Sequence, residues 1–275
     1  MVVRLLHIPE DSLYHSEPPP SMFGNDENED SPTWTNPNWL KSRFHFSFAE
    51  YHDPSNDHFG VLRVMNDDLV QPLRGFGMHP HRDMEIVTYI LEGHLTHQDS
   101  MNRGMAQKIG RGSVQFMTAG TGVRHSEHNL EESPLRFVQV WVLPAMRGLQ
   151  PRYGGFDGSD PDAVVARRNN LAHIVGDARG GTAAPVGIHQ DCNFYCSELD
   201  PGKSVSFCLQ PGRQAYLLCA EGSIKVDGAE ASPLALDRHD AAECRGDGEL
   251  ILTAGGAGSH LLLVEMAEGS GGRRT

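Results

Sequence analysis

The stretch GMHPHRDMEIVTYILEG, residues 77–93, holds the pattern from which both the fold and a metal site can be predicted. His79 and His81 are separated by one residue, and His125 and Glu127 repeat this spacing further along the chain. On a β-strand, residues i and i+2 point to the same face. Two neighbouring strands can therefore direct four side chains at one point. Imidazole and carboxylate groups are ligands of Fe, Mn, Ni, Cu and Zn.

Strand parity adds further candidates. A regular strand that continued through residue 85 would point Asp83 and Glu85 to the same face as the first histidine pair, and Asn129 would join the second pair. A bend after Asp83 would remove that side chain, so we rank Asp83 and Asn129 below the two pairs. Ten other histidines are expected to be surface or core residues, because only clustering indicates a ligand: His7, His15, His45, His52, His58, His94, His97, His189, His239 and His260.

Short apolar runs separated by turns extend through the first half of the chain. We expect strands at residues 1–8, 39–51, 59–65, 85–91, 107–109, 113–117 and 136–143. Asn66, Asp67 and Asp68 are expected to end the third of these strands. The chain has 30 Gly and 17 Pro, which favour turns over long helices. Short strands with regular glycine punctuation are typical of an all-β sandwich or barrel.

The strand pattern is interrupted at residues 151–161, which are rich in Gly, Asp and Pro, and then recurs. The recurring strands are expected at residues 194–199, 204–209, 215–219, 223–226, 249–253 and 260–266. The sequence therefore predicts two domains, residues 1–155 and residues 156–275. The second domain resembles the first but carries no His-x-His pair, so we expect it to lack metal ligands.

An acidic, proline-rich segment occupies about residues 9–36. No Lys or Arg occurs between Leu5 and Leu40, whereas Asp, Glu and Pro are frequent there. This composition is typical of a solvated, mobile loop. We expect it to have no catalytic role, and a lid or a partner-binding loop is the alternative.

Charge and cysteine usage limit the function classes. The formal net charge is -13, which argues against a nucleic-acid partner because such binding depends on Lys and Arg, but leaves a protein partner open. No apolar run approaches the length of about 18 residues that a membrane span needs. Five Cys, an odd number, without a secretory signal fit reduced thiols in a cytosol-like compartment. We therefore expect a cytoplasmic protein.

The two motifs resemble those of the cupins. His79-x-His81-x-x-x-Glu85, followed by Gly93, resembles the first cupin motif, and the stretch from Gly112 to Asn129 resembles the second. More narrowly, GFGMHPHRDMEIVTYILEGHLTHQDS at residues 75–100 and FMTAGTGVRHSEHN at residues 116–129 are similar to the pirin family. The branch they resemble is often described as quercetin 2,3-dioxygenase.

This resemblance implies a bicupin, that is, two tandem cupin barrels with the metal in the N-terminal one. The family's ligands correspond to four residues of this chain: His79, His81, His125 and Glu127. A cupin outside this family would use Glu85 as the carboxylate ligand instead. Thr118 stands where the general second motif has Pro, which is a pirin trait. The acidic segment is longer than the branch leads us to expect, so we expect the route into the site to differ as well. The resemblance implies Fe(II) as the metal, with Mn, Ni, Cu or Zn as alternatives.

The resemblance also implies an oxidoreductase. The expected reaction is the dioxygenase cleavage of a flavonol such as quercetin, an aromatic enol, with O2 as co-substrate and release of CO. Glu127 is the first candidate for the catalytic base and Glu85 the second. One alternative is a non-catalytic iron-binding redox sensor that acts as a transcriptional cofactor, which leaves a nuclear location open. The other alternative is a metal-dependent cupin isomerase. We expect a monomer.

Overall fold

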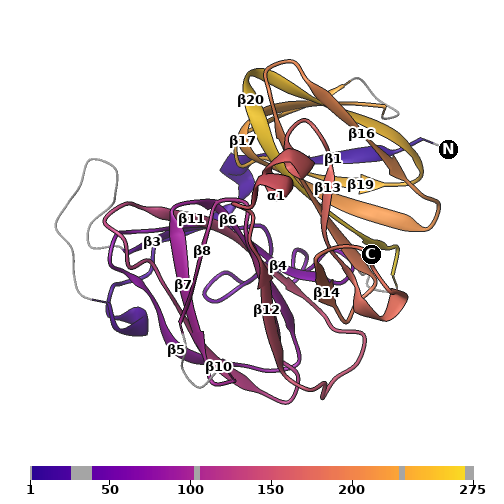
Figure 1. Cartoon of the computed structure of the whole chain (residues 1–275). Helices are drawn as coiled ribbons and strands as arrows, with labels where there is room; N and C mark the ends of the chain where they lie inside the picture. Colours follow the sequence, from indigo (N-terminus) through magenta and orange to yellow (C-terminus); the bar gives the residue numbers. More distant parts are fainter. Residues whose placement is uncertain (1, 26–38, 102–105, 229–232, 270–275) are drawn as a thin grey trace. The chain divides into compact units, whose positions relative to one another are not determined.

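A computed structural model describes residues 2–25, 39–101, 106–228 and 233–269 of the chain (Figure 1). The chain forms two compact units. The N-terminal unit comprises Tyr14–His58 and Leu62–Ser159, and the C-terminal unit comprises Met1–Leu13, Phe59–Val61 and Asp160–Thr275. These units differ from a division into residues 1–155 and 156–275, because the first strand of the chain pairs with a strand near its end.

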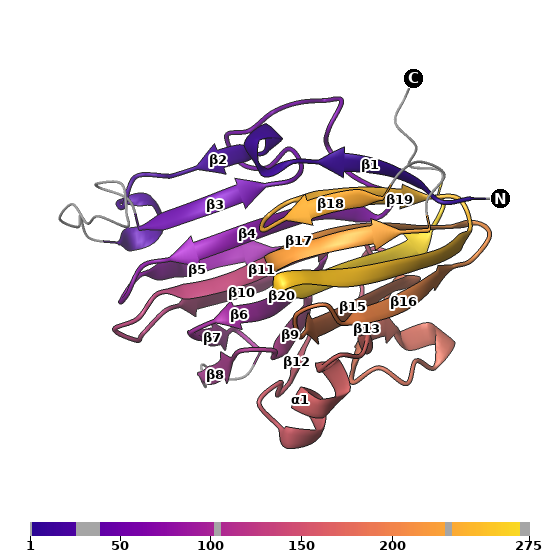
Figure 2. The ribbon, with the colours of Figure 1, turned by 90° about the horizontal axis from the view of Figure 1, so that it is seen from above.

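Two antiparallel sheets build the N-terminal unit. The seven-stranded sheet has the order β12-β9-β6-β11-β4-β3-β2, and the four-stranded sheet has the order β5-β10-β7-β8. Figure 2 shows β3, β4 and β11 side by side, as their pairing requires. The strands of this unit are β2 (Tyr14–Ser16), β3 (Leu40–Phe44), β4 (Leu62–Val70), β5 (Gly75–His81), β6 (Glu85–Glu92), β7 (His94–Asp99), β8 (Gln107–Gly110), β9 (Val114–Thr118), β10 (Val123–His128), β11 (Leu135–Val142) and β12 (Arg152–Phe156).

Strand β4 is longer than the sequence predicts. It continues through the acidic triplet at residues 66–68, which was expected to end it, and stops only at Val70. The triplet stays in the strand because its central residue, Asp67, is paired with a cation inside the unit. Asp67 receives two hydrogen bonds from the Arg136 guanidinium, at 2.8 and 2.6 Å, and the Ser42 hydroxyl donates to Asp68. Buried charged groups are tolerated when they are paired in this way.

The segment before the undescribed residues 26–38 packs against β5. Its last turn is a 3-10 helix, η2 (Met22–Gly24). The side chain of Asn25 donates to the carbonyl oxygen of Gly75 at 2.9 Å and accepts from the Gly75 amide at 3.0 Å. A Cβ atom on Gly77 would lie 2.7 Å from the carbonyl oxygen of Phe23, so only glycine permits this approach. The first part of the acidic segment is thus held on β5, and residues 26–36 lie outside the described part of the chain.

One nine-stranded sheet forms most of the C-terminal unit. Its strands are ordered β1-β19-β17-β20-β15-β13-β14, with β16 paired to β20 and β18 paired to β17. The elements are β1 (Arg4–Ile8), η1 (Glu10–Ser12), α1 (Pro161–Arg167), β13 (Ala172–Asp177), η3 (Ala178–Gly180), β14 (Val186–Ile188), β15 (Cys192–Leu199), β16 (Ser204–Leu209), β17 (Arg213–Asp227), β18 (Leu234–Asp237), β19 (Ala241–Arg245) and β20 (Gly248–Ala267). Leu217, Leu252 and Leu263 belong to its buried apolar core.

The all-β prediction is confirmed, since α1 is the one α-helix of the described residues. Asp160 caps the start of α1 by accepting the Asp162 amide. None of the helices in the described ranges has the length and apolar character that crossing a membrane requires. All five cysteines are free thiols.

The pair between Asp67 and Arg136 is expected to be a major stabilising contact of the N-terminal unit. Asp67→Ala leaves the guanidinium buried without its counter-charge, and we expect the free energy of unfolding to fall by about 3–5 kcal/mol. Urea unfolding followed by circular dichroism measures this loss. The matched control is Glu131→Ala, which removes the partner of an exposed pair with Lys108 and should change little. An unchanged urea midpoint for Asp67→Ala would contradict the prediction.

Candidate metal centre

Strand β5 carries the first histidine pair, and a local irregularity orients it. In the pairing of β5 with β10, His79 faces His125, but Phe76 faces Glu127, so two residues of β5 lie opposite one residue of β10. This is a β-bulge at Gly77 and Met78. The bulge brings the carbonyl oxygen of Gly77 to 2.7 Å from Nδ1 of His79. Because a carbonyl oxygen only accepts hydrogen bonds, Nδ1 carries the proton and Nε2 keeps its lone pair.

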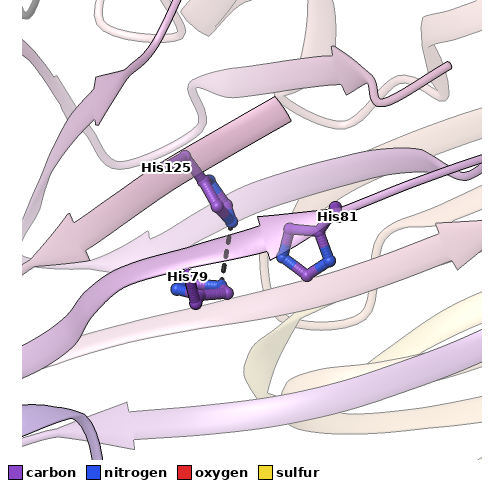
Figure 3. Close-up of side chains that lie close together, drawn as sticks. All are labelled: His79, His81 and His125. Carbon is purple, nitrogen blue, oxygen red and sulfur yellow. Dashed lines mark hydrogen bonds between the residues drawn. The ribbon is translucent and has the colours of Figure 1, made fainter. Parts of the chain in front are cut away.

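Strand β10 carries the second pair and faces the first. The Nε2 atoms of His79 and His125 lie 3.0 Å apart (Figure 3). The ring centroid of His81 is 4.8 Å from that of His79 and 4.8 Å from that of His125. Ligand atoms of these three histidines all lie within 4.8 Å of one another. A second group with the same spacing contains His97, His125 and Glu127. The three histidines that the sequence singles out as ligands thus form one group, and Glu127 lies in a second group that shares His125 with the first.

The histidines are held in their neutral form. Burial and the neighbouring imidazole of His79 lower the pKa of His81 to about 4. Burial also lowers the pKa of His125, with further lowering from the rings around it, and burial lowers that of His79. A neutral imidazole offers a nitrogen lone pair, which is the form that binds a metal ion.

Glu127 is buried and connects the two sheets of the N-terminal unit. Its Oε1 accepts from Thr88 Oγ1 at 3.3 Å and from the side-chain amide of Gln115, and its Oε2 accepts from Gln139 Nε2 at 3.0 Å. Burial raises the pKa of Glu127 to about 7, and the three hydrogen bonds oppose this rise. The carboxyl is therefore close to half-protonated at neutral pH in the absence of a metal ion.

His97 is a residue of the site that the sequence analysis assigned to the surface or core. On β7 it lies directly opposite Glu127, and Asp99 lies opposite His125. His97 Nε2 donates to Asp99 Oδ2 at 3.1 Å, its ring stacks on Tyr153, and Nδ1 has no hydrogen-bond partner among the described residues. His97 and Asp99 share the i, i+2 spacing of the two ligand pairs, so strand parity was the signal that could have found them.

The other candidates lie elsewhere. Glu85, the second candidate base, is fully buried, but it belongs to neither ligand group, and its Oε2 accepts from Thr118 Oγ1 at 2.8 Å. Asp83 sits at the predicted bend, with φ +49°, and accepts the Gly148 amide. Asn129 donates to backbone carbonyl groups, that of Ser133 among them. These three side chains have structural partners of their own.

A cavity of about 250 Å³ opens beside the imidazoles in the N-terminal unit. His79, His81 and Glu127 line one part of it. Its walls are mostly apolar and include Phe23, from the acidic segment, whose ring contacts that of His79 at 5.3 Å between centroids. The remaining aromatic lining residues are Trp39, Phe44, Phe48, Phe76 and Trp141. The segment that composition places in solvent thus contributes to the wall of the site.

Comparisons with known proteins identify the family. The family model described as Pirin matches residues 27–142, and the model described as Quercetinase C-terminal cupin domain matches residues 177–266. A Pseudomonas aeruginosa protein, named provisionally as a quercetin 2,3-dioxygenase, is 42% identical over 84% of this chain and 94% of its own length. The chain belongs to the pirin family. The predicted arrangement of two cupin domains is thereby confirmed.

Other pirin relatives give the same picture. The quercetin 2,3-dioxygenase of Escherichia coli K12 is 39% identical over 72% of this chain and 81% of its own. The crystal structure of the bacterial pirin YhhW from Escherichia coli, in complex with nickel(II), superposes with a TM-score of 0.76 at 28% identity and covers 96% of this chain and 99% of that one. A divalent metal ion is thus present in a pirin of the same fold.

The donor set of this chain fits such an ion. Neutral imidazoles and one carboxyl converge from β5 and β10, and the lone pair of His79 is directed toward His125. This nitrogen-rich set with one oxygen donor suits Fe, Ni, Mn, Cu or Zn better than Mg or Ca. Both groups of clustered ligands found among the described residues lie in the N-terminal unit.

Removal of one imidazole should abolish metal binding. His125 belongs to both ligand groups, so His125→Ala is expected to lower the metal content from about one ion per chain to near zero. Elemental analysis of purified protein measures this content. His94→Ala is the matched control, because His94 is an exposed histidine outside the clusters, and it should keep its metal. Equal metal content in the two variants would argue against the site.

Metal affinity should rise with pH across neutrality. In the metal-free protein the pKa of Glu127 is about 7, so below this pH a bound proton must leave before the carboxylate can bind the ion. His81, with a pKa of about 4, is already neutral. Chelator competition should show affinity rising up to about tenfold per pH unit below pH 7 and levelling above it. Glu127→Gln should flatten this dependence, and a flat profile in the unaltered protein would contradict the assignment.

Proposed function

We propose that this pirin is a metal-dependent dioxygenase that opens the heterocycle of a flavonol such as quercetin, with release of CO. The observation that carries the proposal is the cavity itself. It places three potential ligands, His79, His81 and Glu127, in the wall of a space that six Phe and Trp side chains also line. Two relatives at about 40% identity carry the name of this activity, which supports the proposal.

The aromatic walls are suited to a flat ring system. The rings of Phe23, Trp39 and Phe76 pack edge to face on one another, with centroids 4.8–6.1 Å apart. Trp141 packs against His81 at 4.8 Å and also lines the cavity. Such walls bind an aromatic substrate by contact and exclude water from it.

We assign the proton-accepting role to Glu127. Its carboxyl lines the cavity together with His79 and His81, which places a proton acceptor beside the space that the substrate would occupy. Gln139, Gln115 and Thr88 fix the orientation of the group through hydrogen bonds. Glu85 is not among the residues that line the cavity, and Thr118 occupies its Oε2, which makes it the weaker candidate.

The ion is proposed to be held by His79, His81, His125 and Glu127, with Fe(II) as the expected metal. A divalent ion at this place would lower the pKa of a bound enol hydroxyl and hold the substrate and O2 near each other. The contribution of the chain is then to orient the ring, take the hydroxyl proton on Glu127 and keep water out.

Oxygen consumption tests this function directly. Protein prepared without oxygen and loaded with Fe(II) should consume O2 when quercetin is added and release CO in equal amount. The double variant His79→Ala, His81→Ala should lose at least about a hundredfold in rate, because the ion is no longer held. Glu127→Gln should lose about 10²–10⁴-fold even where it retains metal, which is the usual contribution of a general base.

Oxygen uptake no faster than that of the double variant would overturn the proposal. Turnover of an enol substrate under nitrogen would instead indicate an isomerase. A partner protein whose affinity differed between Fe(II)- and Fe(III)-loaded protein, without any turnover, would indicate a redox sensor.

A further inference from the structure

The cavity has a polar side that the proposed reaction does not use. Strand β4 contributes Asn66 and Asp68 to the lining, on the same face of the sheet because they are two residues apart. In the pairing of the strands, Asn66 lies directly opposite Gln139 on β11, and Asp68 lies opposite Ser42 on β3. Gln139 and Ser42 also line the cavity. A polar strip therefore runs across the sheet, from the partner of Glu127 to β3.

Asp68 is a buried carboxyl with little internal compensation. Ser42 donates to its Oδ1, and this is its one side-chain hydrogen bond among the described residues, so Oδ2 is not engaged. Burial raises the pKa of Asp68 to about 8, with smaller contributions from Asp67 and Glu127, while the Ser42 hydrogen bond opposes the rise. At neutral pH the group is therefore mostly protonated and can donate a hydrogen bond as well as accept one.

Asn66 also keeps hydrogen-bonding capacity that the fold does not use. Its side chain is 97% buried, since only 3% of its surface is exposed, yet Oδ1 has no hydrogen-bond partner among the described residues. Buried carboxamide oxygens nearly always accept a hydrogen bond. An oxygen that lies in the wall of a ligand cavity and accepts none is explained by a hydrogen bond from the ligand. A half-turn of the terminal amide would present Nδ2 in place of Oδ1, so Asn66 can either accept or donate.

We propose that Asn66 and Asp68 form a second polar subsite that binds a hydroxyl substituent of the substrate, remote from the hydroxyl that reacts. The inference rests on the proposed function for the identity of the substrate. A hydroxyl is the group that fits, because it donates one hydrogen bond and accepts others, as Asn66 and Asp68 together require. The subsite selects polyhydroxylated flavonols over flavonols that carry the reacting enol alone.

Binding, measured apart from turnover, tests this inference. Metal-loaded protein is titrated without oxygen with quercetin and with 3-hydroxyflavone, which keeps the enol and lacks the other hydroxyls. Quenching of the fluorescence of Trp39 and Trp141, which line the cavity, reports binding. We expect the unaltered protein to bind quercetin at least about tenfold more tightly. Asn66→Leu, similar in volume but apolar, should lose most of this preference by weakening quercetin alone.

Two further variants separate polar recognition from general packing. Phe44→Leu is the matched control, because Phe44 lies opposite Asn66 on β3 and lines the same cavity. It should weaken both ligands equally and leave their ratio unchanged. Asp68→Asn keeps a hydrogen-bond donor of the same shape and should keep the preference, whereas Asp68→Val should lose it. If Asn66→Leu does not fold, Asn66→Ser gives the same test, since its shorter side chain does not reach the ligand.

The binding experiment can fail or succeed independently of the oxygen-consumption experiment that tests the proposed function. Equal affinity of the unaltered protein for the two flavonols, or an unchanged ratio in Asn66→Leu, overturns the subsite even if quercetin is turned over. A preference for quercetin that Asn66→Leu removes supports the subsite even if no oxygen is consumed. Loss of the preference in Asp68→Asn would show that a carboxylate charge is required, and would overturn the hydroxyl as the bound group.

Discussion

The hydrogen bonding of the buried Glu127 carboxyl is the contact on which the candidate metal centre depends. Glu127 lies on β10 of the four-stranded sheet, while its three donors come from β6, β9 and β11 of the seven-stranded sheet. A buried carboxyl without such partners would be strongly destabilising. The hydrogen bonds that satisfy it also tie the two sheets together at the point where the imidazoles converge. The stability of the unit and the geometry of the site are therefore coupled.

The requirement that buried polar groups be hydrogen-bonded also shapes strand β4, which pairs with β11. Both carboxylate oxygens of Asp67 accept hydrogen bonds from Arg136, so this residue serves the fold. Asp68 and Asn66 are satisfied only in part, and both face the cavity. Within β4, Asp67 makes a two-bond contact with Arg136 that serves the fold, whereas Asn66 and Asp68 keep hydrogen-bonding capacity that a ligand can use.

Strand periodicity accounts for the parts of the site that could be predicted. The spacing within His79 and His81, and within His125 and Glu127, fixes a common face for each pair, and the structure brings His125 of the second pair to both residues of the first. His97 and Asp99 show the same spacing, but the sequence does not tell that they face the site, because this depends on the pairing of β7 with β10. The acidic triplet of β4 escaped prediction for a related reason. Polar residues usually end strands, and only partners distant in sequence, such as Arg136, allow them to be buried.

The sequence alone determined the all-β class, the two candidate ligand pairs and, through motif resemblance, the pirin family. Tertiary structure decided that β10 pairs with both β5 and β7, that the bulge at Gly77 and Met78 sets the tautomer of His79, and that Phe23 lines the cavity. The physical reason is one of range. Side-chain alternation is local to a strand and can be read along the chain, whereas register, burial and hydrogen-bond satisfaction depend on which distant segments meet.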